Sequence, residues 1–284
     1  MGISLEKVSY SYIKSRKHRK YVVKDVSLNI EDKDEFIALV GETGSGKSTL
    51  ATLFNALKTP TEGIATINGV KLKKVHRRKD HYNDIRKHVG LVFQFPDYQL
   101  FEETVLKDVM FGPKNFGHKN DAKELAEKAL RMVRLPEDKW MESPFSLSGG
   151  EKKMASIAGI IASDPDILVL DEPIAGLDPE NKNKLLEILE DLNKSEHKSI
   201  VMIVHDMNTV YRYAKRVLVM NRGNLVFDGT PYDLFINNEH IVKECKLDEP
   251  DTVRIAKELN KMCGLTLDIS KKTIDELAEE IIHG

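Results

Sequence analysis

A glycine-rich segment that ends in lysine and serine carries the clearest chemistry in this sequence. It reads Gly41-Glu42-Thr43-Gly44-Ser45-Gly46-Lys47-Ser48 and matches the pattern G-x-x-x-x-G-K-[ST] between an apolar run and an amphipathic stretch. Glycines let successive backbone N–H groups turn toward a polyanion without a side-chain clash, and a following helix adds the positive end of its dipole. We expect Lys47 to reach the β- and γ-phosphates of a nucleoside triphosphate and Ser48 to ligate Mg²⁺, with Thr49 beside them in the binding site.

Two carboxylates follow an apolar run farther along the chain. Asp171 and Glu172 come directly after Ile167–Leu170, a continuous hydrophobic segment typical of a buried parallel strand. Acidic residues at the carboxyl end of such a strand lie where ligands bind in open α/β sheets. We expect Asp171 to hold the Mg²⁺ shell and Glu172 to polarise an attacking water as a general base. We call residues 41–48 the phosphate loop. Together with this loop, the two carboxylates predict hydrolysis of the bound nucleotide.

Further motifs accompany these two in a fixed order along the chain. They are Gln94 after the run Val89–Phe93, Leu147-Ser148-Gly149-Gly150-Glu151 ahead of an amphipathic helix, Asp178 in Ala175-Gly176-Leu177-Asp178, and His205 after Ile200–Val204. In this order the set resembles the motifs of ABC-type ATPases, a group of P-loop NTPases. The resemblance covers residues 3 to about 230.

The resemblance implies a mechanism in which two cassettes pack head to tail, and each ATP with its Mg²⁺ lies between them. Ser148, Gly149 and Gly150 would then contact a nucleotide held by the partner chain. A serine hydroxyl and glycine amides at a helix N-terminus form an anion site, which agrees with that role.

The remaining motif residues would surround the same nucleotide. His205 would contact the γ-phosphate and orient water, and Gln94 would link Mg²⁺ to the interface with a transport subunit. Asp178 would belong to the catalytic set. Tyr12 resembles the aromatic residue that stacks on adenine, although Tyr10, two positions earlier in a predicted strand, would lie on the same face.

The segment Leu147–Glu151 and the helix start after it resemble the signature sequence of the family, and we call them the signature. Two of its positions depart from the family pattern. Glu151 stands where glutamine is usual, and Met154 stands where arginine is expected, while Lys152 and Lys153 occupy other helical angles. These departures are compatible with a heterodimer whose two ATP sites are unequal, and a homodimer remains an alternative. A catalytically weak, mainly structural cassette is a further alternative.

The elements that must position these residues predict an α/β fold with a mainly parallel sheet. Apolar runs at Phe36–Val40, Val89–Phe93, Ile167–Leu170 and Ile200–Val204 predict its strands. Alternating segments predict a smaller antiparallel sheet at Ile3–Tyr12, Val22–Ile30 and Ala65–Asn68. Residues from about 99 to 163 lack a strand pattern and predict an inserted helical subdomain. The family resemblance implies the same parts around a RecA-like core.

The chain beyond the core predicts a hairpin and then a helical appendage. Val217–Met220 and Leu225–Phe227 flank a short turn, and Asp251–Cys263 predicts a helix that ends at Gly264. Thr273 and Glu276 have the spacing of a capping box that would start a last helix. We therefore divide the chain into a nucleotide-binding domain, residues 1–228, and a C-terminal helical extension, residues 229–284.

Composition excludes several classes of protein. Lys and Arg number 43 and Asp and Glu number 45 in 284 residues, so the formal net charge of −2 disfavours a globally basic nucleic-acid binder. No segment approaches the ~20 apolar residues that a membrane-spanning helix needs. Met1–Tyr12 lacks the apolar centre of a secretion signal. The basic clusters at residues 16–20 and 71–79 are interpreted as solvated loops because no aromatic side chains interleave with them.

The loop after Gln94 indicates which group of ABC-type ATPases the sequence resembles most. Residues 93–105, together with Gly229–Phe235 and the helical tail, resemble the ATPases of energy-coupling-factor importers, which take up vitamins or metal ions. That resemblance implies a second ATPase subunit, a transmembrane coupling protein and a substrate-binding membrane subunit, with this chain peripheral on the cytoplasmic side of the cell membrane. The alternative is a non-transport ABC ATPase acting on ribosomes or DNA. Such relatives usually carry two fused cassettes or long inserted arms, and neither is visible here.

Overall fold

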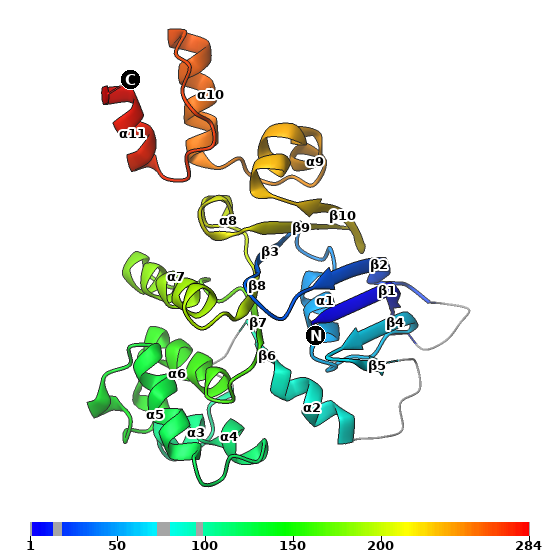
Figure 1. Cartoon of the computed structure of the whole chain (residues 1–284), viewed down its shortest axis with the longest axis vertical. Helices are drawn as coiled ribbons and strands as arrows, with labels where there is room; N and C mark the ends of the chain where they lie inside the picture. Colours follow the sequence, from blue (N-terminus) through cyan, green and yellow to red (C-terminus); the bar gives the residue numbers. More distant parts are fainter. Residues whose placement is uncertain (1, 14–18, 73–79, 95–98, 284) are drawn as a thin grey trace.

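The computed structural model describes residues 2–13, 19–72, 80–94 and 99–283, and it is shown in Figure 1. Most of both basic clusters lies outside the described residues, as do Phe95, Pro96, Asp97 and Tyr98 of the loop after Gln94.

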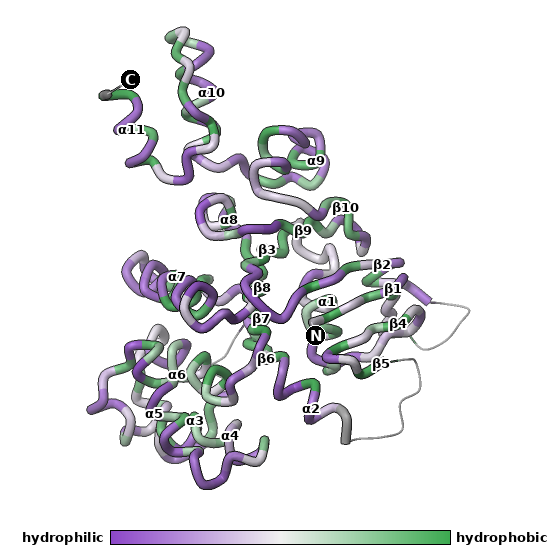
Figure 2. The backbone as a smooth tube through the Cα atoms, viewed as in Figure 1, coloured by the Kyte–Doolittle hydropathy of each residue, from purple (hydrophilic) through white to green (hydrophobic). Residues whose placement is uncertain are grey.

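A six-stranded sheet forms the centre of the chain, with the strand order β10-β9-β3-β8-β7-β6. Its strands are β3 (Phe36–Val40), β6 (Val89–Val92), β7 (Ile167–Asp171), β8 (Ser199–Ile203), β9 (Arg216–Asn221) and β10 (Asn224–Gly229). β9, β3, β8, β7 and β6 pair in parallel, and only β10 runs antiparallel, as the second strand of a hairpin with β9. Figure 2 shows the hydrophobic character of β3 and of its neighbour β9 in this sheet.

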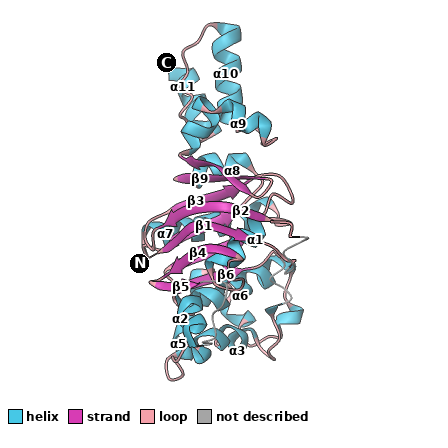
Figure 3. Ribbon diagram, turned by 90° about the vertical axis from the view of Figure 1, so that its right-hand side faces the viewer, coloured by secondary structure: helices cyan, strands magenta, loops and turns pink. Residues whose placement is uncertain are grey.

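A second, antiparallel sheet has the order β2-β1-β4-β5. It consists of β1 (Ile3–Tyr10), β2 (Val23–Ile30), β4 (Glu62–Ile67) and β5 (Val70–Leu72). Alternate residues such as Ile3 and Leu5 are buried, because one face of this sheet packs on the core beneath it. Seen from the side, the two sheets are stacked in the middle of the molecule, with helices beyond them at both ends (Figure 3).

Helices surround the central sheet and extend the molecule at both ends (Figure 1). They are α1 (Lys47–Phe54), α2 (Asp80–His88), α3 (Val105–Val109), α4 (Phe111–Asn115), α5 (Ala122–Met132), α6 (Gly149–Ile161), α7 (Pro179–Lys194), α8 (Met207–Tyr213), α9 (Glu239–Glu244), α10 (Asp251–Cys263) and α11 (Ile274–His283). Short 3₁₀ turns occupy Glu137–Lys139 and Pro144–Ser146, and a π-helical turn occupies Asp233–Asn237.

The two faces of the central sheet pack into different hydrophobic cores. Phe36, Ala38 and Val40 of β3 face a core that includes α6 and α7, whereas Ile37 and Leu39 face a core that includes α1 and the antiparallel sheet. The same alternation holds in β6, β7 and β8, because successive side chains of a strand point to opposite faces. Both faces are covered, which explains why these strands are continuous apolar runs. It also means that α1 and α6 lie on opposite sides of one sheet.

The fold class predicted from the sequence is confirmed: a P-loop core with a mainly parallel sheet, an antiparallel β subdomain, and helices. Small differences occur at strand ends, because tertiary pairing decides where a strand stops. The strand expected to reach Phe93 ends at Val92, and the one expected to reach Tyr12 ends at Tyr10. α10 ends before Gly264, whose φ is +67°. The division at residues 228 and 229 stays a prediction.

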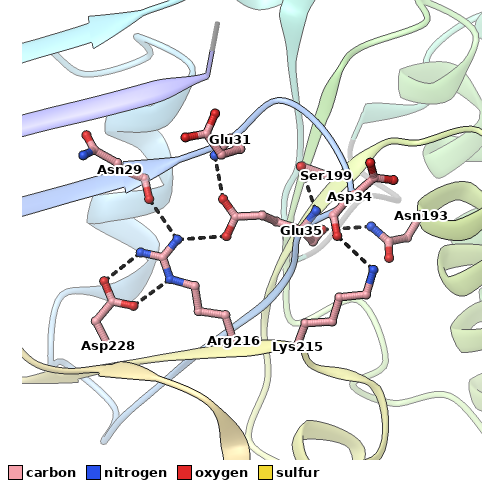
Figure 4. A network of polar contacts seen from close by, with 9 residues as sticks. All are labelled: Asn29, Glu31, Asp34, Glu35, Asn193, Ser199, Lys215, Arg216 and Asp228. Atoms are coloured by element: carbon pink, nitrogen blue, oxygen red, sulfur yellow. Dashed lines mark hydrogen bonds and ion pairs between the residues drawn. The ribbon is translucent and has the colours of Figure 1, made fainter.

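Arg216, at the start of β9, joins four segments of the chain (Figure 4). Its guanidinium donates two hydrogen bonds to the Asp228 carboxylate, at 2.6 and 2.7 Å, one to Glu35 at 2.8 Å, and one to the carbonyl oxygen of Asn29 at 3.0 Å. These bonds raise the pKa of Arg216 above its ordinary value. Arg216 therefore ties the start of β9 to β10, to the end of β2 and to the turn before β3.

We predict that Arg216→Met lowers the free energy of unfolding by about 2 kcal/mol, because it leaves two partly buried carboxylates without their partner. This figure is below the range for fully buried pairs because the Arg216 and Asp228 side chains are 27% and 35% exposed. Urea unfolding measures the change. Lys194→Met removes an exposed pair with Glu190 and is the matched control, with a change below about 0.5 kcal/mol. Equal losses in both variants would contradict the special role of Arg216.

Candidate functional site

The phosphate loop connects β3 to α1, and its backbone requires glycine at defined positions. Gly41, Gly44 and Gly46 have φ of +140°, +81° and +107°. A Cβ at Gly41 would lie 2.1 Å from the carbonyl oxygen of Met220, and one at Gly46 would lie 2.6 Å from that of Val22. Any side chain at these two positions would therefore clash with backbone atoms, and the glycines let the loop wrap closely before the helix begins.

Lys47 is the first residue of α1 and is almost fully buried, with 5% of its surface exposed. Its Nζ donates hydrogen bonds to the carbonyl oxygens of Gly41, at 2.7 Å, and Glu42, at 3.0 Å. Burial lowers the pKa of this ammonium, while the charges of Glu172 and Asp171 oppose the shift. The positive charge is thus held inside the loop and close to the two predicted carboxylates.

Asp171 ends β7 and faces the same loop. It is 8% exposed, and its Oδ1 atom is buried with no hydrogen-bond partner among the described residues. Burial raises the pKa of this carboxyl group, and a hydrogen bond from Ser48 opposes that rise. A buried, unpartnered carboxylate oxygen beside a serine hydroxyl has the donor chemistry that Mg²⁺ prefers.

Glu172 brings together residues from three strand ends. Its carboxylate accepts a hydrogen bond from Gln94 Nε2 at 2.8 Å and lies 3.0 Å from His205 Nε2. Gln94 follows β6, Glu172 follows β7 and His205 follows β8, and these neighbouring strands are parallel. The backbone of Glu172 adopts φ of +51°, which costs about 1–2 kcal/mol for a residue with a Cβ. Such strain is characteristic of functional sites.

Tyr12 lies against the first turn of α1. Its hydroxyl is 3.0 Å from Thr49 Oγ1, and its ring meets the edge of the Tyr10 ring at a centroid distance of 5.1 Å. Tyr12 is 57% exposed, whereas Tyr10 is partly buried. Of the two tyrosines considered for adenine stacking, only Tyr12 combines an exposed ring with a contact to the phosphate-binding helix.

The signature segment forms the N-terminus of α6. Ser148 is the N-cap, its Oγ accepts a hydrogen bond from the Glu151 N–H at 3.3 Å, and Glu151 accepts one from the Ser148 N–H at 2.8 Å. These hydrogen bonds lower the pKa of Glu151, so the carboxylate is ionised at neutral pH. Met154, the other departure from the family pattern, is 2% exposed and packs in the core.

Asp178 lies close to the signature, to which it is linked through Asn181. It is the N-cap of α7, where it accepts hydrogen bonds from the backbone and side-chain nitrogens of Asn181 at 3.0 and 2.6 Å. The Asn181 Nδ2 atom would in turn lie 3.2 Å from a Cβ placed on Gly150. These N–H groups lower the pKa of Asp178.

The predicted site residues thus form two groups within one chain. The first gathers at the carboxyl edge of the central sheet and comprises Tyr12, the loop 41–49, Gln94, Asp171, Glu172 and His205. The second comprises Ser148, Gly149, Gly150 and Asp178. Sequence reasoning missed Asn181 and the capping partnership of Glu151, although the spacing Ser-x-x-Glu at 148–151 is the signal for a capping box.

Two negative findings apply to the part of the chain that the structure describes. Within residues 2–13, 19–72, 80–94 and 99–283, none of the helices combines the length and apolar character needed to cross a membrane. Nor do three His, Cys, Asp or Glu side chains of those residues gather into a group able to hold a metal ion.

Comparison with known proteins gives a consistent family. The model of the ABC transporter family matches residues 23–175. The energy-coupling factor transporter ATP-binding protein EcfA2 of Ligilactobacillus salivarius is 42% identical over 283 residues, covering 99% of this chain and 97% of that protein. The EcfA2 protein of Streptococcus thermophilus is 42% identical over 285 residues and covers all of both chains.

Solved structures agree with these relatives. The structure of cbiO1 from Clostridium perfringens, part of the ABC transporter complex cbiONQ, has a TM-score of 0.73 and 28% identity, covering 92% of this chain and 95% of that one. The dimeric cassette MJ0796, in a post-hydrolysis state bound to ADP and phosphate, has a TM-score of 0.72 and 29% identity, covering 81% and 98%. The strand-end site and these full-length similarities lead to one conclusion: this chain belongs to the ATP-binding proteins of energy-coupling factor transporters, a family of ABC ATPases.

Proposed function

We propose that this chain binds ATP with Mg²⁺ at the carboxyl edge of its central sheet and hydrolyses it between two cassettes. Hydrolysis would drive the uptake of a vitamin or metal ion through separate membrane subunits. The observation that carries this proposal is the meeting of Gln94, Glu172 and His205 beside the buried Lys47. An ion-pair network with a purely structural role does not need a phosphate loop next to it.

The residues of the loop supply binding and orientation. Lys47 and the loop N–H groups neutralise the phosphates, and the exposed face of Tyr12 supports the adenine ring. Asp171, Ser48 and Gln94 fit a magnesium ion, which would neutralise developing charge on the phosphates. The support for this fit is the buried Asp171 Oδ1 that lacks a hydrogen-bond partner among the described residues.

Glu172 is the proposed general base. Its carboxylate accepts a proton from a water aligned with the γ-phosphate, and His205 contacts that phosphate and holds the water in line. Gln94 and His205 both hydrogen-bond Glu172, so a shift of either loop would move the base. This coupling suits a motor, in which a membrane subunit that displaces the Gln94 loop alters hydrolysis.

A second cassette completes the proposed site. Ser148 and Gly150 begin α6, which packs on the face of the central sheet opposite to α1. The sheet lies between these two helices, which supports a site completed by the signature of another cassette. Head-to-tail pairing with another cassette brings a signature onto each loop, and Asp178, adjacent to Gly150, comes to the same interface.

Glu151 gives this signature an unusual charge. Its carboxylate is held at the Ser148 N–H, and it is ionised. The Ser148 Oγ accepts from Glu151 N–H and keeps its own O–H for a phosphate oxygen. A negative charge beside an anion site weakens phosphate binding, so this signature supports the opposite ATP less strongly than a neutral one would.

The proposed contact with the membrane subunits is a groove lined by residues of α3, α4 and α6 and by Gln99, Leu100 and Phe101. A cavity of about 290 Å³ is lined by Leu100, Phe101, Phe111, Phe116 and Ile160, and its rim is open to solvent. Asp108 forms one side and accepts hydrogen bonds from the N–H groups of Phe101 and Glu102, both at 2.8 Å. This groove has the apolar character that receives an amphipathic helix, and we assign that helix to the transmembrane coupling protein.

Replacement of the base tests the proposed chemistry. Glu172→Gln keeps a hydrogen-bond acceptor for Gln94 but removes the basic oxygen, so hydrolysis should slow about 10²–10⁴-fold while ATP still binds. Single-turnover hydrolysis and nucleotide binding, measured on the assembled transporter, separate the two effects. Glu180→Gln, an exposed glutamate on α7, is the control. Wild-type turnover by the Glu172→Gln complex would show that another group is the base.

Replacement of the signature glutamate tests its charge. Glu151→Gln preserves the capping geometry and removes the negative charge, so it should tighten ATP binding at the opposite site about 2–5-fold, equivalent to roughly 0.5–1 kcal/mol. Equilibrium ATP binding to the paired cassettes measures this change. Glu124→Gln, in the first turn of α5, should have no effect. Weaker binding by Glu151→Gln would mean that the carboxylate helps rather than opposes the signature.

Replacement of an aromatic residue tests the groove. Phe111 is 47% exposed and its ring meets Phe101 edge-on. Phe111→Ser should weaken association with the coupling protein about tenfold or more, because burial of a phenylalanine is worth roughly 1.5–3 kcal/mol. Quantitative co-purification from membranes measures this, with Val226→Ser, on β10, as the exposed apolar control. Full recovery of Phe111→Ser with the membrane subunits would locate docking elsewhere, and recovery with ribosomes or DNA would favour the other class of function.

A further inference from the structure

Helix α8 is held at both ends by the C-terminal part of the chain. At its first turn, Asn208 Nδ2 donates to Asp251 Oδ2 at 2.7 Å, and the Asp251 N–H donates to Asn208 Oδ1 at 2.8 Å. Near its last turn, the Tyr211 hydroxyl donates to the carbonyl oxygen of Ile269 at 2.8 Å. Asp251 begins α10, and Ile269 lies in the segment before α11, so both contacts come from residues beyond 229.

The short loop that carries His205, residues 204–206, connects β8 to the N-terminus of α8. We call it the His205 loop. Asp206 is the N-cap of α8 and accepts a hydrogen bond from the Asn208 N–H at 3.0 Å. Lys182 of α7 and the hydroxyl of Thr209 hold the same carboxylate from the other side, at 2.5 and 2.7 Å. The backbone directly after His205 is therefore fixed to α8 and α7 through Asp206.

The segment between α9 and α10 closes around this loop. Asp248, Glu249 and Asp251 line a cavity of about 410 Å³ together with His205 and Asn208. At its other end the segment reaches the phosphate loop, where Lys246 Nζ lies 2.8 Å from Glu42 Oε1. The segment thus spans from the phosphate loop to the His205 loop, and Figure 1 shows α10 beginning on the side of the molecule that carries α8.

We propose that Asn208 and Asp251 are positioning residues for His205, through which the C-terminal part of the chain sets the rate of ATP hydrolysis. This inference rests on the proposed function, in which His205 acts at the γ-phosphate. The reciprocal hydrogen bonds fix the first turn of α8, and that turn fixes the distance between His205 and Glu172. Neither Asn208 nor Asp251 is assigned a contact with ATP, so both act through His205.

A charge substitution separates this role from nucleotide binding. Asn208→Asp places a carboxylate opposite that of Asp251 and removes the donor, so the pair repels. Turnover in the full transporter should fall about 3–10-fold, with the KM for ATP within about twofold of the wild type, because loss of one hydrogen bond is typically worth that factor. The double variant Asn208→Asp with Asp251→Asn restores both hydrogen bonds with one donor reversed, and it should recover the turnover.

Matched controls identify a merely structural effect. The Arg254 guanidinium lies 2.5 Å from Asp251 Oδ1 and is the ion-pair partner of that carboxylate. Arg254→Gln removes this ion pair and should leave turnover unchanged. Thermal unfolding of each variant shows whether a loss of turnover follows a loss of folded protein. Wild-type turnover by Asn208→Asp would overturn the proposal, and so would a loss that Asp251→Asn does not rescue.

Combining Asn208→Asp with His205→Ala separates a failure of this inference from a failure of the proposed function. If Asn208 acts through His205, Asn208→Asp should cause no further loss in single-turnover hydrolysis once His205→Ala is present. A further loss of the same factor would overturn the positioning role while leaving the function intact. Unchanged hydrolysis by His205→Ala alone would instead refute the function assigned to His205, and this inference with it.

Discussion

Parallel pairing of β6, β7 and β8 is the constraint on which the site depends. Strands that run in the same direction end at the same edge, so the residues after them meet there even though they are far apart in the chain. Gln94 and His205 come together on Glu172 for this reason, and the phosphate loop after β3 joins them at that edge. Glu172 accepts a left-handed backbone to hold its carboxylate there, which the packing on both faces of the sheet stabilises.

The same sheet separates the two halves of the proposed catalytic machinery. Because its side chains alternate between two cores, α1 and α6 cover opposite faces of the sheet. Pairing of two cassettes is therefore part of the proposed function, since the complete site would take its phosphate loop and its signature from different chains. Glu151 caps the N-terminus of α6, and its ionised carboxylate places a negative charge beside the proposed anion site.

The chain beyond residue 229 contacts two parts of the proposed ATP site. Asp251 and Ile269 form hydrogen bonds with Asn208 and Tyr211 of α8. Lys246 forms an ion pair with Glu42 in the phosphate loop. An exposed ion pair such as Lys246–Glu42 contributes little to stability. Its importance is its position, because it and the Asp251 contact lie at opposite ends of one short segment. The C-terminal part of the chain therefore contacts both the phosphate loop and the helix that follows His205.

The local patterns of the sequence determined the existence of most strands, the glycine-lysine loop, the end of α10 and the start of α11, because each depends on neighbours in the chain. Phe36–Val40 is a strand at the predicted residues, and Gly264 and the Thr273–Glu276 capping box end and begin the predicted helices. The order of motifs also indicated the family. Only the tertiary structure decided that Glu172 bridges Gln94 and His205, that Arg216 joins four segments, and that Asp251 holds Asn208. These contacts link residues distant in sequence, and strand order and helix packing, which no local pattern encodes, bring them together.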